Sequence, residues 1–331
     1  MINFAKNKRM NIKDYIEKLE RLGAEALSQE EKTILKNMGT SVSIHDFLSK
    51  ITIEEIELRR ENARSFNVKR MDDKELFDAI MNAISFDVDG TRQSILMQRY
   101  LTYPERTRLY KIRSLDAEDH FVPLKAMSKE QDAWNAPEDL CEVGRVNKEG
   151  ESLLYTSPSP NVCVEEMNIK DGERFCLIVY ESIKSIKATL IGIWEDNPDL
   201  SKEDNLKMRM ITNILGDLFA KEVGKGTEHL YRVSERIAKD YFDLPRDIQD
   251  AWCYPSIAAK LGYNLCFRPD VAKDVLKLVG IQVCTVKRDE DNYLYSCQVV
   301  AKWNEESNSF NYFPINSPQC RQIFPEIQVK M

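Results

Sequence analysis

Histidine is scarce in this sequence: only His45, His120 and His229 occur among 331 residues. None of them has a metal-ligating residue three or four positions further on, the spacing that a helical metal site needs. The eight cysteines begin only at Cys141 and form no C-x-x-C pair. These absences argue against a zinc site, a thioredoxin-like redox site and histidine-centred catalysis, and we expect no metal cofactor.

Long hydrophobic runs are also absent. The longest, Phe175–Tyr180, is far shorter than the roughly 18 residues of a membrane-spanning helix, and the N-terminal residues contain no apolar signal segment. The net charge of −7, from 47 basic and 54 acidic residues, argues against charge-driven binding of nucleic acid. Free thiols without a secretion signal are typical of a reducing compartment. We therefore expect a cytoplasmic protein with neither a nucleic-acid nor a membrane partner.

The first hundred residues show helical periodicity with recognisable caps. Thr52 with Glu55 and Asp72 with Glu75 match the capping box, in which a side chain at each end of the first turn binds a backbone N–H. Helices are also expected to begin at Asn11 and Ser28, and residues 91–101 continue the helical pattern. We expect residues 1–103 to form a helical adaptor or regulatory domain whose charged helix faces meet water.

After Pro104 the pattern changes to short β-rich runs mixed with helices. Strands are expected at Arg108–Arg113, Leu153–Tyr155, Arg174–Tyr180 and Ala188–Trp194, and a hairpin at Ile281–Lys287 and Tyr293–Trp303. Helices are expected from Glu203, over Tyr231–Tyr241 and from Pro269. Because no regular strand–helix–strand alternation is present, the fold class predicted is α+β, with residues 104–331 as the second domain.

The stretch Phe86–Thr91 contains Asp87-Val88-Asp89-Gly90-Thr91, which matches the DxDGT signature of haloacid-dehalogenase-type phosphotransferases. In that chemistry the first carboxylate is the nucleophile beside a magnesium ion, at the end of a buried parallel strand. The residues before it have helical periodicity instead. A chain reversal at Asp89-Gly90, between two helices, is therefore the favoured interpretation.

Residues suited to an anionic, nucleotide-like ligand recur in separate segments of the second half. Arg113 ends a strand, Arg145 lies in a loop bounded by Gly144 and Gly150, and Tyr155 is on the next strand. Glu165 and Glu166 lie on a short helix, and Ser256 follows much later, with Asn264 beyond. Each also has a purely structural interpretation: surface ion pairs for the arginines, helix-dipole charges for the glutamates, core packing for the tyrosine and a helix cap for the serine.

Taken together, these segments resemble the RES-domain family, named for its arginine, glutamate and serine, from about Arg108 to Val286. The resemblance rests on the order of LYKIR, GRVNKEG, LLYTS, VCVEEM, YRVSERIA and YPS followed by NLCFRPD. It implies a fold resembling ADP-ribosyltransferase toxins and consumption of NAD, characteristically by a phosphorylase, in proteins that are often toxins of toxin–antitoxin pairs. Lys111 departs from the family, which usually has arginine there, and Ala251-Trp252-Cys253 replaces a glycine–isoleucine.

The resemblance implies a role for each residue. Arg113 and Arg145 would clamp the pyrophosphate, which guanidinium groups bind in a bidentate manner, and Tyr155 would stack on nicotinamide or its ribose. Glu166, with Glu165 as the alternative, would stabilise the oxocarbenium charge that develops as the glycosidic bond breaks. Ser256 would bind the ligand or position the attacking phosphate. Glu166, Arg113 and Ser256 are thus the expected catalytic residues, and Tyr231 and Ser234 are at most supporting. The residues expected to bind NAD are Arg113, Arg145, Tyr155, Glu166 and Ser256.

The activity expected is conversion of NAD and phosphate to nicotinamide and ADP-ribose-1″-phosphate. Water or a protein side chain could replace phosphate as the acceptor, which would give a glycohydrolase or an ADP-ribosyltransferase. A different class of function is also open: a partner-binding module with a degenerate RES domain, as Lys111 suggests. An antitoxin or regulatory protein contacting residues 1–103 is the expected macromolecular partner, and a second copy of the chain is a further candidate.

Overall fold

The computed structural model describes residues 44–259, 262–289 and 292–327. The helices expected from Asn11 and Ser28 lie outside these residues. No helix in the described ranges is both long enough and apolar enough to cross a membrane.

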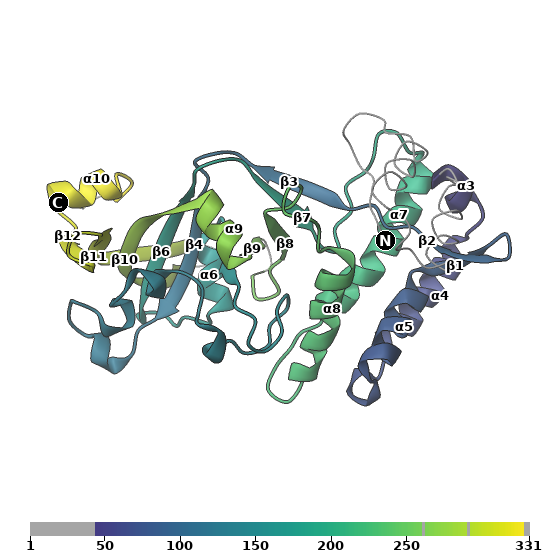
Figure 1. Cartoon of the computed structure of the whole chain (residues 1–331), viewed down its shortest axis with the longest axis horizontal. Helices are drawn as coiled ribbons and strands as arrows, with labels where there is room; N and C mark the ends of the chain where they lie inside the picture. The colour runs from purple at the N-terminus through teal and green to yellow at the C-terminus, as the bar shows by residue number, and fades with distance from the viewer. Residues whose placement is uncertain (1–43, 260–261, 290–291, 328–331) are drawn as a thin grey trace, which may run out of the picture.

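Two five-stranded sheets form the centre of the molecule (Figure 1). The first, in the order β12-β11-β10-β6-β4, is antiparallel throughout and consists of β4 (Arg108–Ser114), β6 (Arg174–Ser182), β10 (Leu276–Asp289), β11 (Asn292–Asn304) and β12 (Ser309–Pro314). The second, in the order β3-β7-β8-β9-β5, consists of β3 (Arg99–Tyr103), β5 (Leu154–Thr156), β7 (Ile186–Leu190), β8 (Ala251–Pro255) and β9 (Tyr263–Phe267). Only its β7–β8 pair is parallel. A bridge between Tyr110 of β4 and Ser157 joins the two sheets at their edges.

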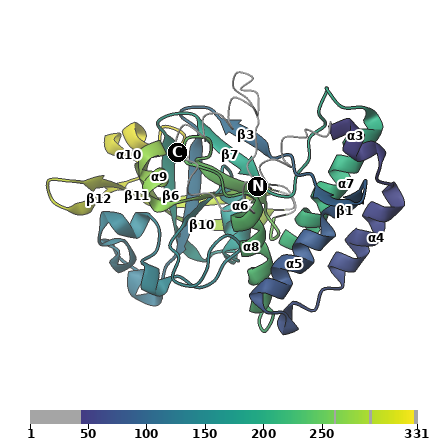
Figure 2. The same cartoon turned by 45° about the vertical axis from the view of Figure 1, so that its right-hand side comes forward.

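Helices lie around the two sheets. They are α3 (Ile44–Ser49), α4 (Ile53–Arg64), α5 (Asp73–Ala83), α6 (Pro160–Glu166), α7 (Lys202–Phe219), α8 (Tyr231–Tyr241), α9 (Pro269–Val275) and α10 (Pro318–Ile323). Figures 1 and 2 show α3, α4, α5, α7 and α8 gathered at one end of the molecule, with α10 at the other.

Three hydrophobic cores correspond to these layers. One lies between the sheets, one joins the second sheet to α7, α8 and the first helices, and the third lies between the outer face of the first sheet and α6 with α10. The alternation of side chains along β8 shows the division: Ala251 and Cys253 belong to the inter-sheet core, whereas Trp252 and Tyr254 face the helices. The predicted α+β class is therefore confirmed.

Most elements of the second half lie close to their predicted positions, but β7 ends earlier than expected. It was predicted over residues 188–194 and runs from Ile186 to Leu190. Two residues later, Gly192 adopts a φ of +70°, and a Cβ there would lie 2.4 Å from Gly216 Cα of α7. Because Gly192 and Gly216 both lack a side chain, the chain can pass close to α7 as it leaves the sheet after β7.

The prediction of helix over residues 91–101 is wrong. β1 (Ser85–Val88) and β2 (Thr91–Ser94) form an antiparallel hairpin, and β3 joins the second sheet beside β7. Asp89 and Gly90 have φ values of +52° and +74°, as the two-residue turn of a hairpin requires. The predicted chain reversal is therefore present, between strands rather than helices. Asp87 is exposed on this hairpin, not at the end of a buried parallel strand, so the phosphotransferase geometry is not formed.

The described part of the first hundred residues shares its core with the rest of the chain. The caps at Thr52 and Asp72 form as predicted, but α4 packs on α7, and the Lys207 ammonium donates to the backbone oxygen of Leu48 at 2.9 Å. Asp217 of α7 accepts hydrogen bonds from Arg60 and Arg64 of α4, each at 2.8 Å. The boundary expected at residues 103/104 therefore does not separate two hydrophobic cores, and the charged face of α4 contacts protein as well as water.

Candidate functional site

Glu166 is the last residue of α6 and lies where this helix meets the turn between β8 and β9. The helix starts with Pro160, which is favourable in the first turn, and rests on β4 through a Cys163 Sγ hydrogen bond to the Tyr110 oxygen. Glu166 Oε1 accepts hydrogen bonds from Ser256 Oγ at 2.6 Å and from Asn264 Nδ2 at 2.7 Å. We call Glu166, Ser256 and Asn264 the Glu166 cluster.

The register of β8 and β9 brings the two donors of this cluster together. Asn264 pairs with Tyr254, and the N–H of Ser256 donates to the oxygen of Gly262 as the strands end. Gly262 has a φ of +142°, and a Cβ there would lie 2.3 Å from Val162 Cγ2 of α6. Only glycine allows the helix so close to this turn.

The donors of the cluster are buried, whereas its carboxylate is not. Ser256 is 8% and Asn264 9% exposed, and Glu166 is an exposed residue. Ser256 Oγ also accepts a hydrogen bond from the N–H of Ala259 at 2.9 Å, which directs its own proton toward Glu166. The carboxylate is therefore fixed from the protein side and open to a ligand from the solvent side.

Glu165, the alternative catalytic carboxylate, points elsewhere. Its Oε1 accepts hydrogen bonds from Arg288 Nε at 2.9 Å, from Arg288 Nη2 at 2.8 Å and from the Tyr293 hydroxyl at 2.8 Å. Both partners lie near the tip of the β10–β11 hairpin. The carboxylate beside Ser256 is thus Glu166, and Glu165 fastens α6 to the hairpin.

The loop at residues 144–147 folds around the hydroxyl of Tyr155. This hydroxyl donates to Asn147 Oδ1 at 2.6 Å and accepts from the Val146 N–H at 3.4 Å. A Cβ at Gly144 would lie 2.4 Å from Asn147 Oδ1 and 3.0 Å from the Tyr155 hydroxyl. The glycine and asparagine of this motif therefore build the loop, and Tyr155 anchors it.

Arg145 extends from this loop to the end of α7. Its Nη1 donates to the backbone oxygens of Phe219 at 2.8 Å and of Lys221 at 3.1 Å, where the helix dipole favours a cation. The guanidinium carbon lies 5.8 Å from the centre of the Tyr231 ring. Arg145 thus fixes its loop to α7 and α8 and places a positive charge there.

Tyr254 lies within electrostatic reach of both Arg145 and Glu166. Burial, with contributions from Cys266 and Glu166, raises the pKa of its phenol well above the usual value, and Arg145 acts in the opposite direction. Its ring packs edge-on against Phe219, with centroids 5.2 Å apart. Sequence reasoning did not select Tyr254, although side-chain alternation along β8 places it on the same face as Trp252.

Arg113 lies on the face of the first sheet opposite the one that packs against α6. It pairs with Cys176 of β6 on the face of the first sheet that lines the inter-sheet core. Its Nη1 donates to the Asp132 backbone oxygen at 3.1 Å and lies 3.9 Å from Asp132 Oδ1. Within residues 44–259, 262–289 and 292–327 no contact joins it to Arg145 or Glu166. In the structure Arg113 therefore binds Asp132, and its part in a clamp of two arginines stays a prediction.

Residues 132–134 lie over this face of the first sheet. Three consecutive backbone oxygens are bound by side chains of the sheet: that of Asp132 by Arg113, that of Ala133 by the Tyr180 hydroxyl and that of Trp134 by the Lys111 ammonium. Burial lowers the pKa of Lys111 to about 8. Both basic residues of LYKIR thus hold the protein's own backbone.

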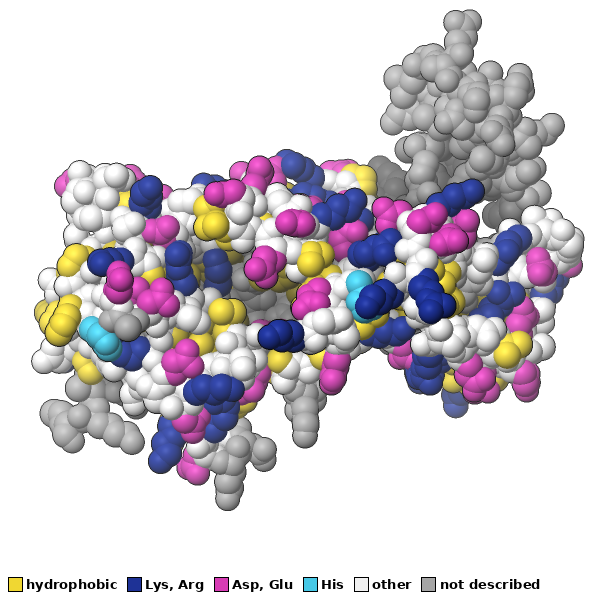
Figure 3. Space-filling model, turned by 90° about the horizontal axis from the view of Figure 1, so that it is seen from below, with side chains coloured by type: hydrophobic (Ala, Val, Ile, Leu, Met, Phe, Trp, Pro, Cys, Tyr) yellow, Lys and Arg dark blue, Asp and Glu magenta, His cyan; other side chains and the backbone are white. Residues whose placement is uncertain are grey.

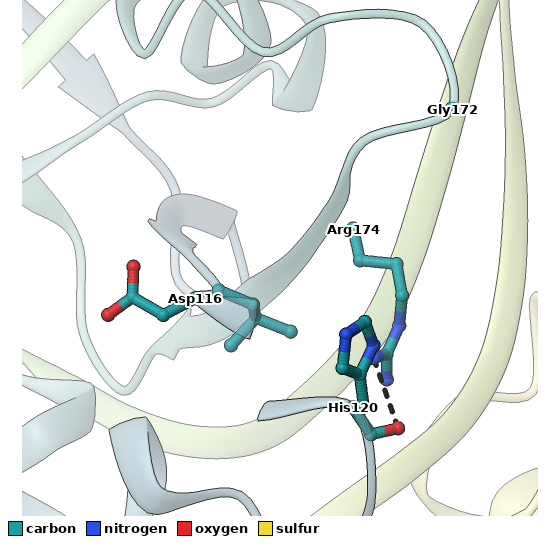
Figure 4. A pocket seen from close by; sticks show the side chains of 5 residues that line it. Asp116, His120, Gly172 and Arg174 are labelled. Atoms are coloured by element: carbon teal, nitrogen blue, oxygen red, sulfur yellow. Dashed lines mark hydrogen bonds between the residues drawn. The ribbon is translucent and has the colours of Figure 1, made fainter. Parts of the chain in front are cut away.

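A pocket of about 300 Å³ lies near the end of β4, away from the Glu166 cluster. It is lined by Leu115, Asp116, His120, Gly172 and Arg174. Figure 4 shows Arg174 directed at the backbone oxygen of His120, which it binds at 3.2 Å. None of the predicted site residues lines this pocket.

On the face seen in Figure 3, acidic and basic side chains are intermixed. In the described ranges, no three or more His, Cys, Asp or Glu side chains are grouped so that they could hold a metal ion.

Comparisons with protein-family models, with curated proteins and with solved structures find no match to this chain. The geometry of the Glu166 cluster and the resemblance of the motifs are therefore the grounds for a functional proposal.

Proposed function

We propose that this chain cleaves the bond between nicotinamide and ribose in NAD, with Glu166 as the catalytic carboxylate. The observation that supports the proposal is the hydrogen bonding of Glu166 Oε1 by two buried donors, Ser256 and Asn264, beside open solvent. A carboxylate fixed in this way can stabilise positive charge on a sugar without having to reorganise.

The reaction proposed is a substitution at the anomeric carbon. As the C1″–N bond breaks, its electron pair leaves with neutral nicotinamide, and the ribose carbon gains oxocarbenium character. Glu166 stabilises this charge and can accept a hydrogen bond from a ribose hydroxyl. A phosphate oxygen then forms the new bond to C1″, which yields ADP-ribose-1″-phosphate.

The neighbouring residues position the ligand in this proposal. Arg145 supplies positive charge for the pyrophosphate from the loop that Tyr155 anchors, while the buried Tyr254 packs against Phe219, whose backbone oxygen Arg145 binds. The proposal assigns the pyrophosphate to Arg145 alone, because Arg113 binds the Asp132 backbone on the face of the first sheet opposite α6. The supporting role expected for Tyr231 fits its contact with Arg145.

The test is incubation of the full chain with NAD and phosphate, followed by mass spectrometry of the products. Glu166→Gln should lower the rate of nicotinamide release by about 100-fold or more, the effect expected when one group that stabilises transition-state charge is lost. Glu306→Gln, an exposed site in the β11–β12 turn, is the matched control and should leave the rate unchanged. Equal rates for the Glu166 variant and the wild type would contradict the assignment.

The acceptor is decided by the same products. A phosphate-dependent ADP-ribose-1″-phosphate signal would support a phosphorylase, and free ADP-ribose a glycohydrolase. Transfer of ADP-ribose to an added protein would support an ADP-ribosyltransferase of the toxin type.

A partner-binding module without turnover is the second candidate function. It is favoured by one observation: both basic residues of LYKIR, Lys111 and Arg113, bind the backbone of residues 132–134. Calorimetry of the full chain with NAD separates the two candidates, since a degenerate domain should release no binding heat. Because α4 packs on α7, a search for an antitoxin or regulator should also use the full chain.

A further inference from the structure

Two of the eight free cysteines lie directly opposite each other in the first sheet. Cys284 of β10 pairs with Cys297 of β11, at a point where a bulge shifts the register between Val283 and Cys284. Directly opposed residues of antiparallel strands have Cα atoms about 4.5–5.5 Å apart, which falls within the range of about 4.4–6.8 Å that a disulfide spans. A directly opposed register of this kind is one that a disulfide can span.

The two thiols also differ in a way that suits oxidation. Cys284 is fully buried, whereas Cys297 is partly exposed. A hydrogen bond with Cys284 lowers the pKa of Cys297, and the same contact, with burial, raises the pKa of Cys284. The accessible sulfur is thus the better nucleophile, and the buried sulfur keeps its proton until it is needed.

The other buried thiols offer a contrast. Burial raises the pKa of Cys163, Cys176 and Cys253 to about 12, so these sulfurs remain protonated and unreactive.

We propose that Cys284 and Cys297 are a two-electron oxidation site that forms a reversible disulfide with a hydroperoxide as oxidant. The Cys297 thiolate attacks the peroxide oxygen, which breaks the O–O bond and gives a sulfenic acid and hydroxide. The Cys284 sulfur then attacks the Cys297 sulfur, and water leaves. Two thiols and one hydrogen peroxide thus give one disulfide and two waters. A dithiol then reduces the disulfide to the two thiols by exchange and is itself oxidised to a disulfide.

The position of the pair gives the cross-link a consequence for α6. Every second pair of this hairpin, counted from the cysteines toward its tip, has its side chains on the same face: Cys284 with Cys297, Val286 with Tyr295 and Arg288 with Tyr293. The Tyr295 hydroxyl donates to Asn161 of α6 at 2.7 Å, and Arg288 and Tyr293 hold Glu165. A disulfide at the first of these pairs therefore restrains the hairpin that fastens the helix bearing Glu166.

Peptide mapping of the full chain tests the pairing, because trypsin can cleave between the two cysteines at Lys287 and Arg288. After treatment with hydrogen peroxide and blocking of free thiols, residues 278–287 and 289–302 should appear as one linked species, lighter than their sum by two hydrogens. Dithiothreitol should separate them. Absence of this species from oxidised, folded protein would overturn the proposal.

Two serine variants sharpen the result. In Cys284→Ser, Cys297 should remain a sulfenic acid that dimedone labels. In Cys320→Ser, the control for a nearby buried thiol that is not opposite Cys297, the link should form as in the wild type. A link from Cys297 to Cys320 instead would refute the assignment.

Hydrogen exchange measures the effect on α6. Backbone amides of residues 161–166 should exchange several-fold more slowly in the oxidised than in the reduced protein, and Cys284→Ser should abolish the difference. Equal exchange in the two wild-type forms would overturn the coupling to α6. Neither experiment depends on the function proposed above, so cleavage of NAD can fail while this site is confirmed.

Discussion

Replacing Asn264 by Asp is expected to destabilise the protein at neutral pH by placing two carboxylates in hydrogen-bond contact. In the wild type, Asn264 Nδ2 donates to Glu166 Oε1 at 2.7 Å. Two unit charges about 3 Å apart repel by about 5 kcal/mol at an effective dielectric of about 20. Uptake of one proton limits the loss, because raising a carboxyl pKa from about 4 to 7 costs about 4 kcal/mol. Glu166 is exposed and screened by water, so we expect a loss of about 1–3 kcal/mol.

The loss should depend on pH, since the repulsion needs both carboxylates ionised. It should be largest near pH 7 and shrink as the pH falls toward about 4, where carboxyl groups take up protons. Urea unfolding followed by tryptophan fluorescence measures it, because Trp252 is fully buried.

A swap of the two groups provides the control. In Glu166→Gln with Asn264→Asp, the amide is on α6 and the carboxylate on β9, so a charge-assisted hydrogen bond can form again. The double variant should recover most of the stability that Asn264→Asp loses. If Asn264→Asp is as stable as the wild type at pH 7, or if the swap is no better than the sum of the single changes, the contact between Glu166 and Asn264 is refuted.

Three further predictions concern the scaffold, and urea unfolding measures each of them. Gly216→Ala should lower the free energy of unfolding by about 1–3 kcal/mol, because the new Cβ would lie 2.7 Å from the Gly192 oxygen. This loss would outweigh the gain of about 1 kcal/mol that alanine ordinarily brings over glycine in a helix. Burial raises the pKa of Asp217, but hydrogen bonds from Arg60 and Arg64 outweigh it, so the pKa lies below the usual aspartate value. The wild type should therefore be more stable than Asp217→Asn at pH 7, and this difference should disappear as the pH falls below the usual aspartate range. Burial lowers the pKa of Lys111 to about 8, so the unfolded chain binds more protons between pH 8 and about 10, and stability should rise over that interval in the wild type but not in Lys111→Met.

Elements with a strong local signal could be predicted from the sequence. The apolar spacing of Tyr231–Tyr241 predicts α8 with its observed bounds, and Thr52 and Asp72 cap α4 and α5 as expected. In these segments the periodicity and the cap lie within the element itself, so no distant partner is needed to define it.

Elements defined by distant pairing could not be predicted in the same way. Residues 91–101 have an apolar spacing that suits a helix, yet β3 forms because Arg99–Tyr103 pair with Ile186–Leu190, almost ninety positions away. Such a pairing leaves little trace in the local pattern, and tertiary contacts override local preference.

The residues of the candidate site also differ in whether the sequence alone could identify them. The resemblance of the motifs selected Glu166 and Ser256, and the structure places them in contact. It gave no sign that Arg113 binds Asp132, because the sequence does not show that residues 132–134 lie over that face of β4. Tyr254 and Asn264 needed the register of β8 with β9 before they could be placed beside Glu166.

The most direct test of the central claim is release of nicotinamide from NAD by the folded full chain. With phosphate present, the wild type should release nicotinamide together with ADP-ribose-1″-phosphate. The Glu166→Gln, Asn264→Asp swap, which keeps the hydrogen bond but moves the carboxylate from α6 to β9, should release none. Intact NAD after incubation with folded wild type, or equal release by the swapped protein, would contradict the account.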